Sequence, residues 1–210
     1  MIIDHNHPAY RQKWSGVGKN RFNGAFFYSK EIVKYFIPNI RTTRNWITVN
    51  VEGVGCDHSI IFIHNNLHPE NYNWLSKYDD LILVCGVPET VEKVKHLGRA
   101  VYLPLSVDIK DVEKYKRRKT REVAYVGRKS KVNGYRFPHG TDYITGLPRT
   151  KLLAQMAEYQ KVFAVGRTAI EARILDCEVL PFDPRYPDPD IWKVIDSREA
   201  VEMLKELLND

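Results

Sequence analysis

The sequence contains no long hydrophobic run, which argues against membrane-spanning helices. A helix needs roughly 18 or more consecutive apolar residues to cross a bilayer. The apolar runs here, such as Ile60–Ile63 and Leu81–Val84, are far shorter and are typical of buried strands. The first residues also lack the basic region and apolar core of a signal peptide. Both absences predict a soluble protein.

Cysteine is scarce as well. The chain has three cysteines, Cys56, Cys85 and Cys177, so they cannot all pair with one another. Cys85 and Cys177 lie in apolar surroundings, as buried thiols usually do. Structural disulfides belong to oxidising compartments, so this usage favours the reducing cytoplasm.

Metal-binding motifs are also missing. His5–His7 and Cys56–His58 offer suitable side chains, but no spacing of four zinc ligands emerges around them. An Asp-x-Asp pattern occurs at Asp188–Asp190, within a proline-rich stretch that reads as an extended loop. We therefore expect no metal and no bound cofactor.

The composition is that of a globular protein, with 43% apolar and 28% charged residues. Strand and helix patterns alternate along the chain, which predicts an α/β fold. We expect strands over residues 46–51, 59–64, 81–85, 100–103, 122–126, 142–145, 161–164 and 179–182. We expect helices over residues 24–36, 69–78, 88–96 and 148–159, from Arg167 onward, and up to residue 208 at the end. A proline at position 38 is expected to end the first helix.

The chain divides into two halves of similar design. Residues 1–105 and 122–210 each look like a small doubly wound, Rossmann-like domain. Residues 106–121 look like a connecting helix followed by a basic linker. Residues 1–23 look irregular.

The net charge is +6, and basic residues gather in two places. One is the segment 114–121, and the other contains Arg128, Lys129, Lys131 and Arg136. A solvated surface explains such clusters. Attraction for a polyanion or a phosphorylated ligand explains them as well.

Residues 161–183 carry the most informative pattern. They read as a buried strand, a tight turn at Gly166, a short helix from Arg167 and a second buried strand. Such a βαβ unit places a helix amino terminus at the carboxyl end of a parallel strand, where open α/β sheets bind phosphate groups. Thr168 either caps this helix or meets a phosphate, and Glu171 lies about one turn into it.

This unit resembles the donor-binding segment of GT-B-type glycosyltransferases, which are nucleotide-sugar dependent. Further pieces follow the same order. A helix opening at Gly24 resembles the first helix of the acceptor domain, residues 101–108 resemble the crossover between domains, and Tyr125–Arg128 resembles the opening of the donor domain. The resemblance implies two Rossmann-like domains that face each other across a cleft, with Gly24 near the substrate.

The resemblance also implies roles for residues of the second half. Arg128, with Lys129 or Lys131, would neutralise the diphosphate of a nucleotide-sugar, while charge builds on its oxygens. Backbone amides at Gly166, Arg167 and Thr168 would meet phosphate, and Glu171 would bond the ribose. A metal-independent transfer of the sugar would follow, because fixed cations take the place of a metal.

His64 ends a predicted strand in the first half, at a position where strands line a ligand crevice. The resemblance suggests a contact with the acceptor or with a sugar hydroxyl. A His could also act as a base there. A plain hydrogen bond to loop backbone is the alternative.

The chain departs from the family pattern in two ways. Phe163 stands where the family often has a second Glu, eight positions before Glu171. The stretch between Arg128 and the strand at Asp142 is also short. A non-catalytic module that binds a nucleotide or nucleotide-sugar therefore stays open, as does a nucleic-acid-binding protein that uses the basic linker. The acceptor of a transferase could be a carbohydrate, a small molecule or a hydroxylated base in DNA, which must be flipped out to react.

Overall fold

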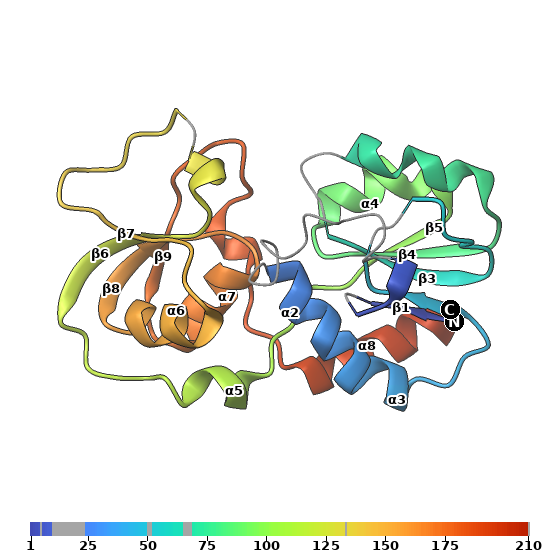
Figure 1. Ribbon diagram of the computed structural model, residues 1–210, viewed down its shortest axis with the longest axis horizontal. Coiled ribbons are helices and arrows are strands. Elements are labelled where there is room, and N and C mark those ends of the chain that lie inside the picture. The colour runs from blue at the N-terminus through green and yellow to red at the C-terminus, as the bar shows by residue number, and fades with distance from the viewer. Residues whose placement is uncertain (5, 10–23, 50–51, 65–68, 133, 210) are drawn as a thin grey trace. The chain divides into compact units, whose positions relative to one another are not determined.

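The structure is a computed structural model that describes residues 1–4, 6–9, 24–49, 52–64, 69–132 and 134–209. Internal contacts divide the chain into two compact units. Unit 1 comprises Met1–Pro104 with Ser197–Asp210, and unit 2 comprises Leu105–Asp196. Each unit contains one sheet whose strands are all parallel, so the predicted α/β class is confirmed (Figure 1).

The sheet of unit 1 has five strands, which are adjacent in chain order. They are β1 (Ile2–Ile3), β2 (Asn45–Ile47), β3 (Ser59–Ile63), β4 (Leu81–Cys85) and β5 (Arg99–Tyr102). Every residue of β3 and β4 is buried, which explains why these strands read as unbroken apolar runs. The sequence did not predict β1, because a strand of two residues has no periodicity to detect.

Helices cover both faces of this sheet. On one face lie α2 (Gly24–Glu31), the π-helical turn η2 (Ile32–Phe36), α3 (Ile37–Asn39) and α8 (Ser197–Asn209); on the other lie the 3-10 helix η3 (Pro69–Lys77), α4 (Pro88–Val94) and η4 (Lys95–Leu97) (Figure 1). Phe62 of β3 packs against the rings of Tyr28 and Phe36. Its neighbours Ile61 and Ile63 belong to the buried cluster that includes η3. Side chains thus alternate between the faces, as expected of a pleated strand.

The first helical segment does not end at Pro38 as predicted. The chain continues through η2 into α3, and Pro38 lies in the first turn of α3. The helix widens just before this proline, where the Ile37 N–H bonds the Ile32 carbonyl five residues back, and such a π-helical turn accommodates a residue that has no N–H to donate.

The terminal helix α8 belongs to unit 1, whereas the sequence placed residues 122–210 together. The apolar stripe of α8, Val201 and Leu204, is buried. Ser197 Oγ donates a hydrogen bond of 2.8 Å to the buried Glu31 carboxylate of α2. Local sequence patterns cannot identify partners that lie more than 160 residues apart. The sequence therefore predicted the helix but not the unit to which it belongs.

The sheet of unit 2 has the strand order β7-β6-β8-β9. Its strands are β6 (Arg121–Val126), β7 (Asp142–Ile144), β8 (Tyr159–Phe163) and β9 (Glu178–Leu180). The helix α5 (Ile109–Glu113), capped by the Asp108 carboxylate, precedes β6. Residues 106–121, which the sequence analysis treated as a linker, are therefore counted within unit 2.

The two faces of this second sheet are covered differently. Helices α6 (Arg149–Met156) and α7 (Arg167–Ile174) lie on one face (Figure 1). The described part of the connection from β6 to β7 has no α-helix and contains one 3-10 turn, η5 (Lys129–Val132). Aromatic rings fill the second face instead, with Phe137 of this connection packed against Tyr125, Phe163 and Phe182.

Candidate functional site

The sheet of unit 2 changes its winding direction between β6 and β8. The strand β7 lies on one side of β6, and β8 and β9 lie on the other. Ala124 of β6 pairs with Val162 of β8, so the two strands end at the same edge. In open α/β sheets, ligands bind outside the carboxyl ends of strands at such a switch point. The segments expected to hold a diphosphate, after Val126 and after Phe163, both begin at this edge.

Gly166 forms the turn out of β8. Its backbone angles of φ 62° and ψ −139° lie in a region that side chains other than glycine avoid. A Cβ built there would meet no heavy atom within 4 Å. The space beside this turn is therefore open to a ligand.

Helix α7 starts directly at Gly166, which is its N-cap. The first hydrogen bond within the helix runs from Ala169 N to Gly166 O at 2.9 Å. The backbone amides of Arg167 and Thr168 therefore come before the first bond of the helical ladder. The capping role considered for Thr168 is wrong, because Gly166 occupies the cap and no side chain caps the helix. Thr168 lies instead in the first turn and is half-buried.

The turn after β6 is shaped by a buried tyrosine. Tyr125 Oη donates a hydrogen bond of 2.7 Å to the Arg128 carbonyl, and a Cβ on Gly127 would overlap this hydroxyl. Burial, with a contribution from Tyr186, raises the pKa of Tyr125, so the hydroxyl keeps its proton and stays a donor. This bond fixes the backbone that carries Arg128.

Three cations follow β6. Arg128 and Lys129 are exposed and Lys131 is half-buried. Desolvation and, to a smaller extent, repulsion by Arg128 lower the pKa of Lys131 to about 8. Within the residues that the structure describes, none of the three has a carboxylate partner. A bound anion would supply the missing counter-charge.

Glu171 lies inside a buried ion network. The residue is 4% exposed, and one carboxylate oxygen accepts hydrogen bonds of 3.0 Å from both Arg149 Nε and Arg167 Nε. Arg149 also binds Asp111. The Arg167 side chain thus points into this network. The group of Arg167 that could contact a ligand at the edge of the sheet is its backbone amide. The ribose contact expected of Glu171 stays a prediction.

The sequence analysis missed Arg149 and Asp111. Arg149 opens α6 and Asp111 lies in α5, at sequence separations of 22 and 60 residues from Glu171. Burial alone would raise the pKa of Asp111, but hydrogen bonds from Lys114 and Arg149 outweigh it and the pKa is lowered. No local motif joins three helices, so only the folded chain reveals this cluster.

The candidate residues of unit 1 are less distinctive. His64 Nε2–H donates to the Thr48 carbonyl oxygen, and its ring meets the Tyr28 ring edge to face at 5.8 Å. Gly24 is the exposed first residue of α2. The roles expected of His64 and Gly24 stay predictions.

The possible metal ligands are dispersed. No group of three or more His, Cys, Asp or Glu that could hold a metal occurs in the part of the chain that the structure describes. His5 lies outside that part. Desolvation raises the pKa of Cys56 to about 11, and His58 Nδ1 lies 2.6 Å from the Asp80 carboxylate.

No helix among the described residues is both long and apolar enough to span a bilayer. This finding agrees with the absence of a long hydrophobic run in the sequence. The longest helix, α8, has 13 residues.

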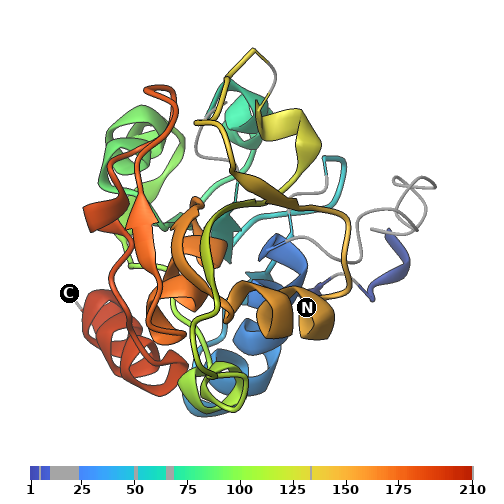
Figure 2. The same cartoon turned by 90° about the vertical axis from the view of Figure 1, so that its left-hand side faces the viewer.

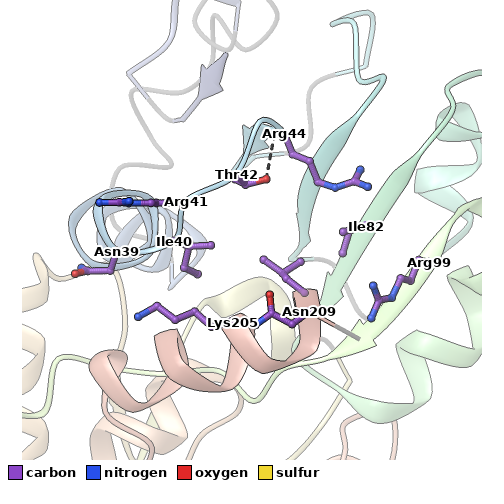
Figure 3. A pocket seen from close by; sticks show the side chains of 10 residues that line it. Asn39, Ile40, Arg41, Thr42, Arg44, Ile82, Arg99, Lys205 and Asn209 are labelled. Atoms are coloured by element: carbon purple, nitrogen blue, oxygen red, sulfur yellow. Dashed lines mark hydrogen bonds between the residues drawn. The ribbon is translucent and has the colours of Figure 1, made fainter.

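A pocket of about 450 Å³ lies in unit 1 and contains no predicted site residue (Figure 3). It adjoins the amino ends of β2, β4 and β5, the edge opposite to that used by ligands of open α/β sheets. Its cations are Arg41, Arg44, Arg99 and Lys205. Arg44 binds Asp80, Arg99 binds the Leu207 carbonyl and Lys205 binds Glu202. Three of these charges therefore serve the fold.

The edge of unit 2 between β6 and β8 is thus the candidate site. At this edge, a segment with three cations that lack carboxylate partners among the described residues follows β6, and the open Gly166 turn that begins α7 follows the neighbouring β8. The resemblance to GT-B glycosyltransferases rests on short motifs in the sequence. No family model, no curated protein and no solved structure matches the chain.

Proposed function

We propose that this chain is a nucleotide-sugar-dependent glycosyltransferase of the GT-B type, in which unit 2 binds the nucleoside diphosphate. The observation that supports this most is the switch point, where Arg128 and Lys131 follow β6 and the Gly166 turn follows the neighbouring β8. Open α/β sheets bind phosphorylated ligands at such points.

The chemistry of sugar transfer requires this kind of site. The bond between the anomeric carbon and the diphosphate oxygen breaks, and its electron pair leaves with the diphosphate. Arg128, Lys131 and the amides that begin α7 would stabilise the charge that develops on those oxygens. The acceptor oxygen forms the new bond to the anomeric carbon and loses its proton to a base. The sequence suggests His64 of unit 1 as that base, and this role stays a prediction.

We assign nucleotide affinity to Arg128 and Lys131 rather than to Glu171. Glu171 is 4% exposed, and one of its oxygens already accepts hydrogen bonds from two arginines. Its carboxylate therefore balances two charges of the fold and presents little surface to a ligand. We prefer Lys131 to Lys129 because desolvation and the nearby Arg128 disfavour the charged form of Lys131. A bound anion would stabilise that charge.

Isothermal titration of the full chain with uridine, guanosine and adenosine diphosphates tests the site. Arg128→Ala should weaken binding of the preferred nucleotide at least about tenfold, because a hydrogen bond to a charged group contributes about 1.5–3 kcal/mol. Arg117→Ala is the matched control, since Arg117 is exposed and paired with Glu158. Equal affinities for wild type and Arg128→Ala would contradict the proposed site.

A non-catalytic nucleotide-binding module is the second candidate. Phe163, which replaces the second Glu of the family pattern, is buried in the aromatic cluster and contacts Phe137 and Phe182. No carboxylate stands at that position to serve transfer. Incubation with several nucleotide-sugars separates the candidates: tight binding with neither hydrolysis nor transfer supports the module.

A further inference from the structure

The connection between β6 and β7 forms a second distinctive surface in unit 2. We call the side chains of Lys129, Arg136 and Tyr143 the β6–β7 surface. Figure 2 shows this connection, in yellow, running from η5 to β7. Arg136 and Lys129 are exposed, and the Tyr143 side chain is 56% exposed on the edge strand β7.

The charge of this surface has one sign. Residues 127–141 contain four Lys or Arg and no Asp or Glu. None of the four has a carboxylate partner in the described part of the chain. The nearest acidic residue in sequence, Asp142, is engaged by Arg121 and by the Tyr159 hydroxyl at 2.8 Å. The surface therefore carries positive charge that the fold does not use.

An aromatic ring lies on the strand that follows, and Phe137, the neighbour of Arg136 in the chain, contacts it. The Tyr143 ring lies 5.6 Å from the Phe137 ring and 6.0 Å from the Tyr125 ring, which support it from one side. Tyr125 and Tyr143 are register partners of neighbouring strands, so both rings emerge from the same face of the sheet. Since β7 is an edge strand, no further strand covers Tyr143. The ring is held in place and can stack on a ligand.

We propose that the β6–β7 surface binds single-stranded nucleic acid. Cations without carboxylate partners, in a connection that leads to an exposed and supported ring, match a strand whose phosphates are neutralised while a base stacks. A duplex keeps its bases stacked on one another and leaves such a ring unused, and an acidic peptide has no regular aromatic planes. This inference goes beyond the proposed function and does not require sugar transfer.

The test is fluorescence anisotropy with a labelled oligo(dT) of about 20 nucleotides, long enough for one binding site. The full chain is titrated at several salt concentrations. Wild type should bind with an affinity that falls steeply as salt rises. Arg136→Ala should reduce the slope of log K against log salt by about 0.7, the value for one phosphate contact of a single strand.

The ring has its own pair of variants. Tyr143→Ala should weaken binding about fivefold or more, since base stacking on aromatic side chains is sequence-tolerant and substantial. Tyr143→Phe keeps the ring and should keep the affinity. Arg117→Ala, which removes a charge that is paired with Glu158, should leave both affinity and slope unchanged.

Several outcomes would overturn the inference. These are no binding, an equal loss in Arg117→Ala and Arg136→Ala, an unchanged affinity in Tyr143→Ala, or equally tight binding of duplex DNA or polyglutamate. Titration of the same variants with nucleoside diphosphates keeps the two proposals apart. Arg136→Ala and Tyr143→Ala should bind the diphosphate like wild type, and a failure of wild type to bind it contradicts the proposed function alone.

Discussion

Two basic segments of unit 2 look alike in sequence and differ in the fold. Residues 114–121 hold six Lys or Arg, and five of these have polar partners. The partners are Asp111 for Lys114, Asp176 for Lys116, Glu158 for Arg117, Asp142 for Arg121, and the Ala157 and Leu175 carbonyls for Lys119. Arg118 has no such partner among the described residues. By contrast, none of the four cations in residues 128–136 has a carboxylate partner among the described residues.

The difference lies in what the fold places nearby. The segment 114–121 leads into β6, and Glu158 at the end of α6 meets it from the neighbouring strand connection. The segment 128–136 lies on the face where rings replace a helix. Clustered charge in a sequence therefore does not reveal whether the charge is available to a ligand. The polyanion attraction considered for both clusters is better supported for the second.

Glu171 gives the largest expected effect, because its charge is paired and buried. Glu171→Ala would leave Arg149 and Arg167 as buried charges without their shared carboxylate. Removing one partner of a buried pair costs about 3–5 kcal/mol of unfolding free energy. Urea denaturation followed by circular dichroism measures it.

Glu178→Ala is the matched control. Glu178 pairs with Lys161 at 3.3 Å, and both side chains are exposed. Its loss should change the unfolding free energy by at most about 0.5 kcal/mol. Similar effects of the two substitutions would mean that the Glu171 network does not stabilise unit 2.

Much of the fold could be predicted from local patterns. The strands β3 and β4 are buried on both faces, so their apolar runs identify them. The strand, turn and helix around Gly166 follow from the same logic, because a glycine that follows a buried strand marks the turn. The observed β8 is Tyr159–Phe163 and α7 is Arg167–Ile174, close to the predicted bounds.

What the sequence could not predict depends on long-range partners. From the sequence alone, Glu171 looks like an exposed helical carboxylate. In the fold it binds Arg149 of another helix, and Arg149 in turn binds Asp111 of a third helix. The segment η3, predicted as an ordinary helix, is a 3-10 helix whose Tyr72 and Leu75 are buried in the core. At the candidate site, the sequence could predict that Arg128 and Gly166 follow strands. That β6 and β8 are neighbours is a property of the sheet.

Lys119 and Lys129 sharpen the contrast between the two basic segments. Lys119 Nζ donates to the Ala157 and Leu175 carbonyls at 3.1 and 2.6 Å. Lys119→Met leaves both acceptors unsatisfied, which costs about 1–3 kcal/mol for buried groups and less here, where the site is half-buried. Lys129→Met should stay within about 0.5 kcal/mol of wild type. Chemical denaturation measures the unfolding free energy of both variants. Equal losses of unfolding free energy would contradict the contrast between the two basic segments.

The smallest expected effect concerns the pH dependence of stability. The pKa of Lys131 is lowered to about 8 in the folded chain, against an ordinary value near 10.4 in the unfolded chain. Between these values the unfolded state binds more protons, so this residue makes stability rise as pH increases from about 8 to about 10.4. Lys131→Met should be the more stable form near neutral pH, and its advantage should shrink across that window. Thermal unfolding of both proteins at a series of pH values measures the difference, which will be modest because Lys131 is half-buried. A constant difference would show that desolvation and Arg128 do not lower the pKa of Lys131, and the need for an anion at this edge would lose its support.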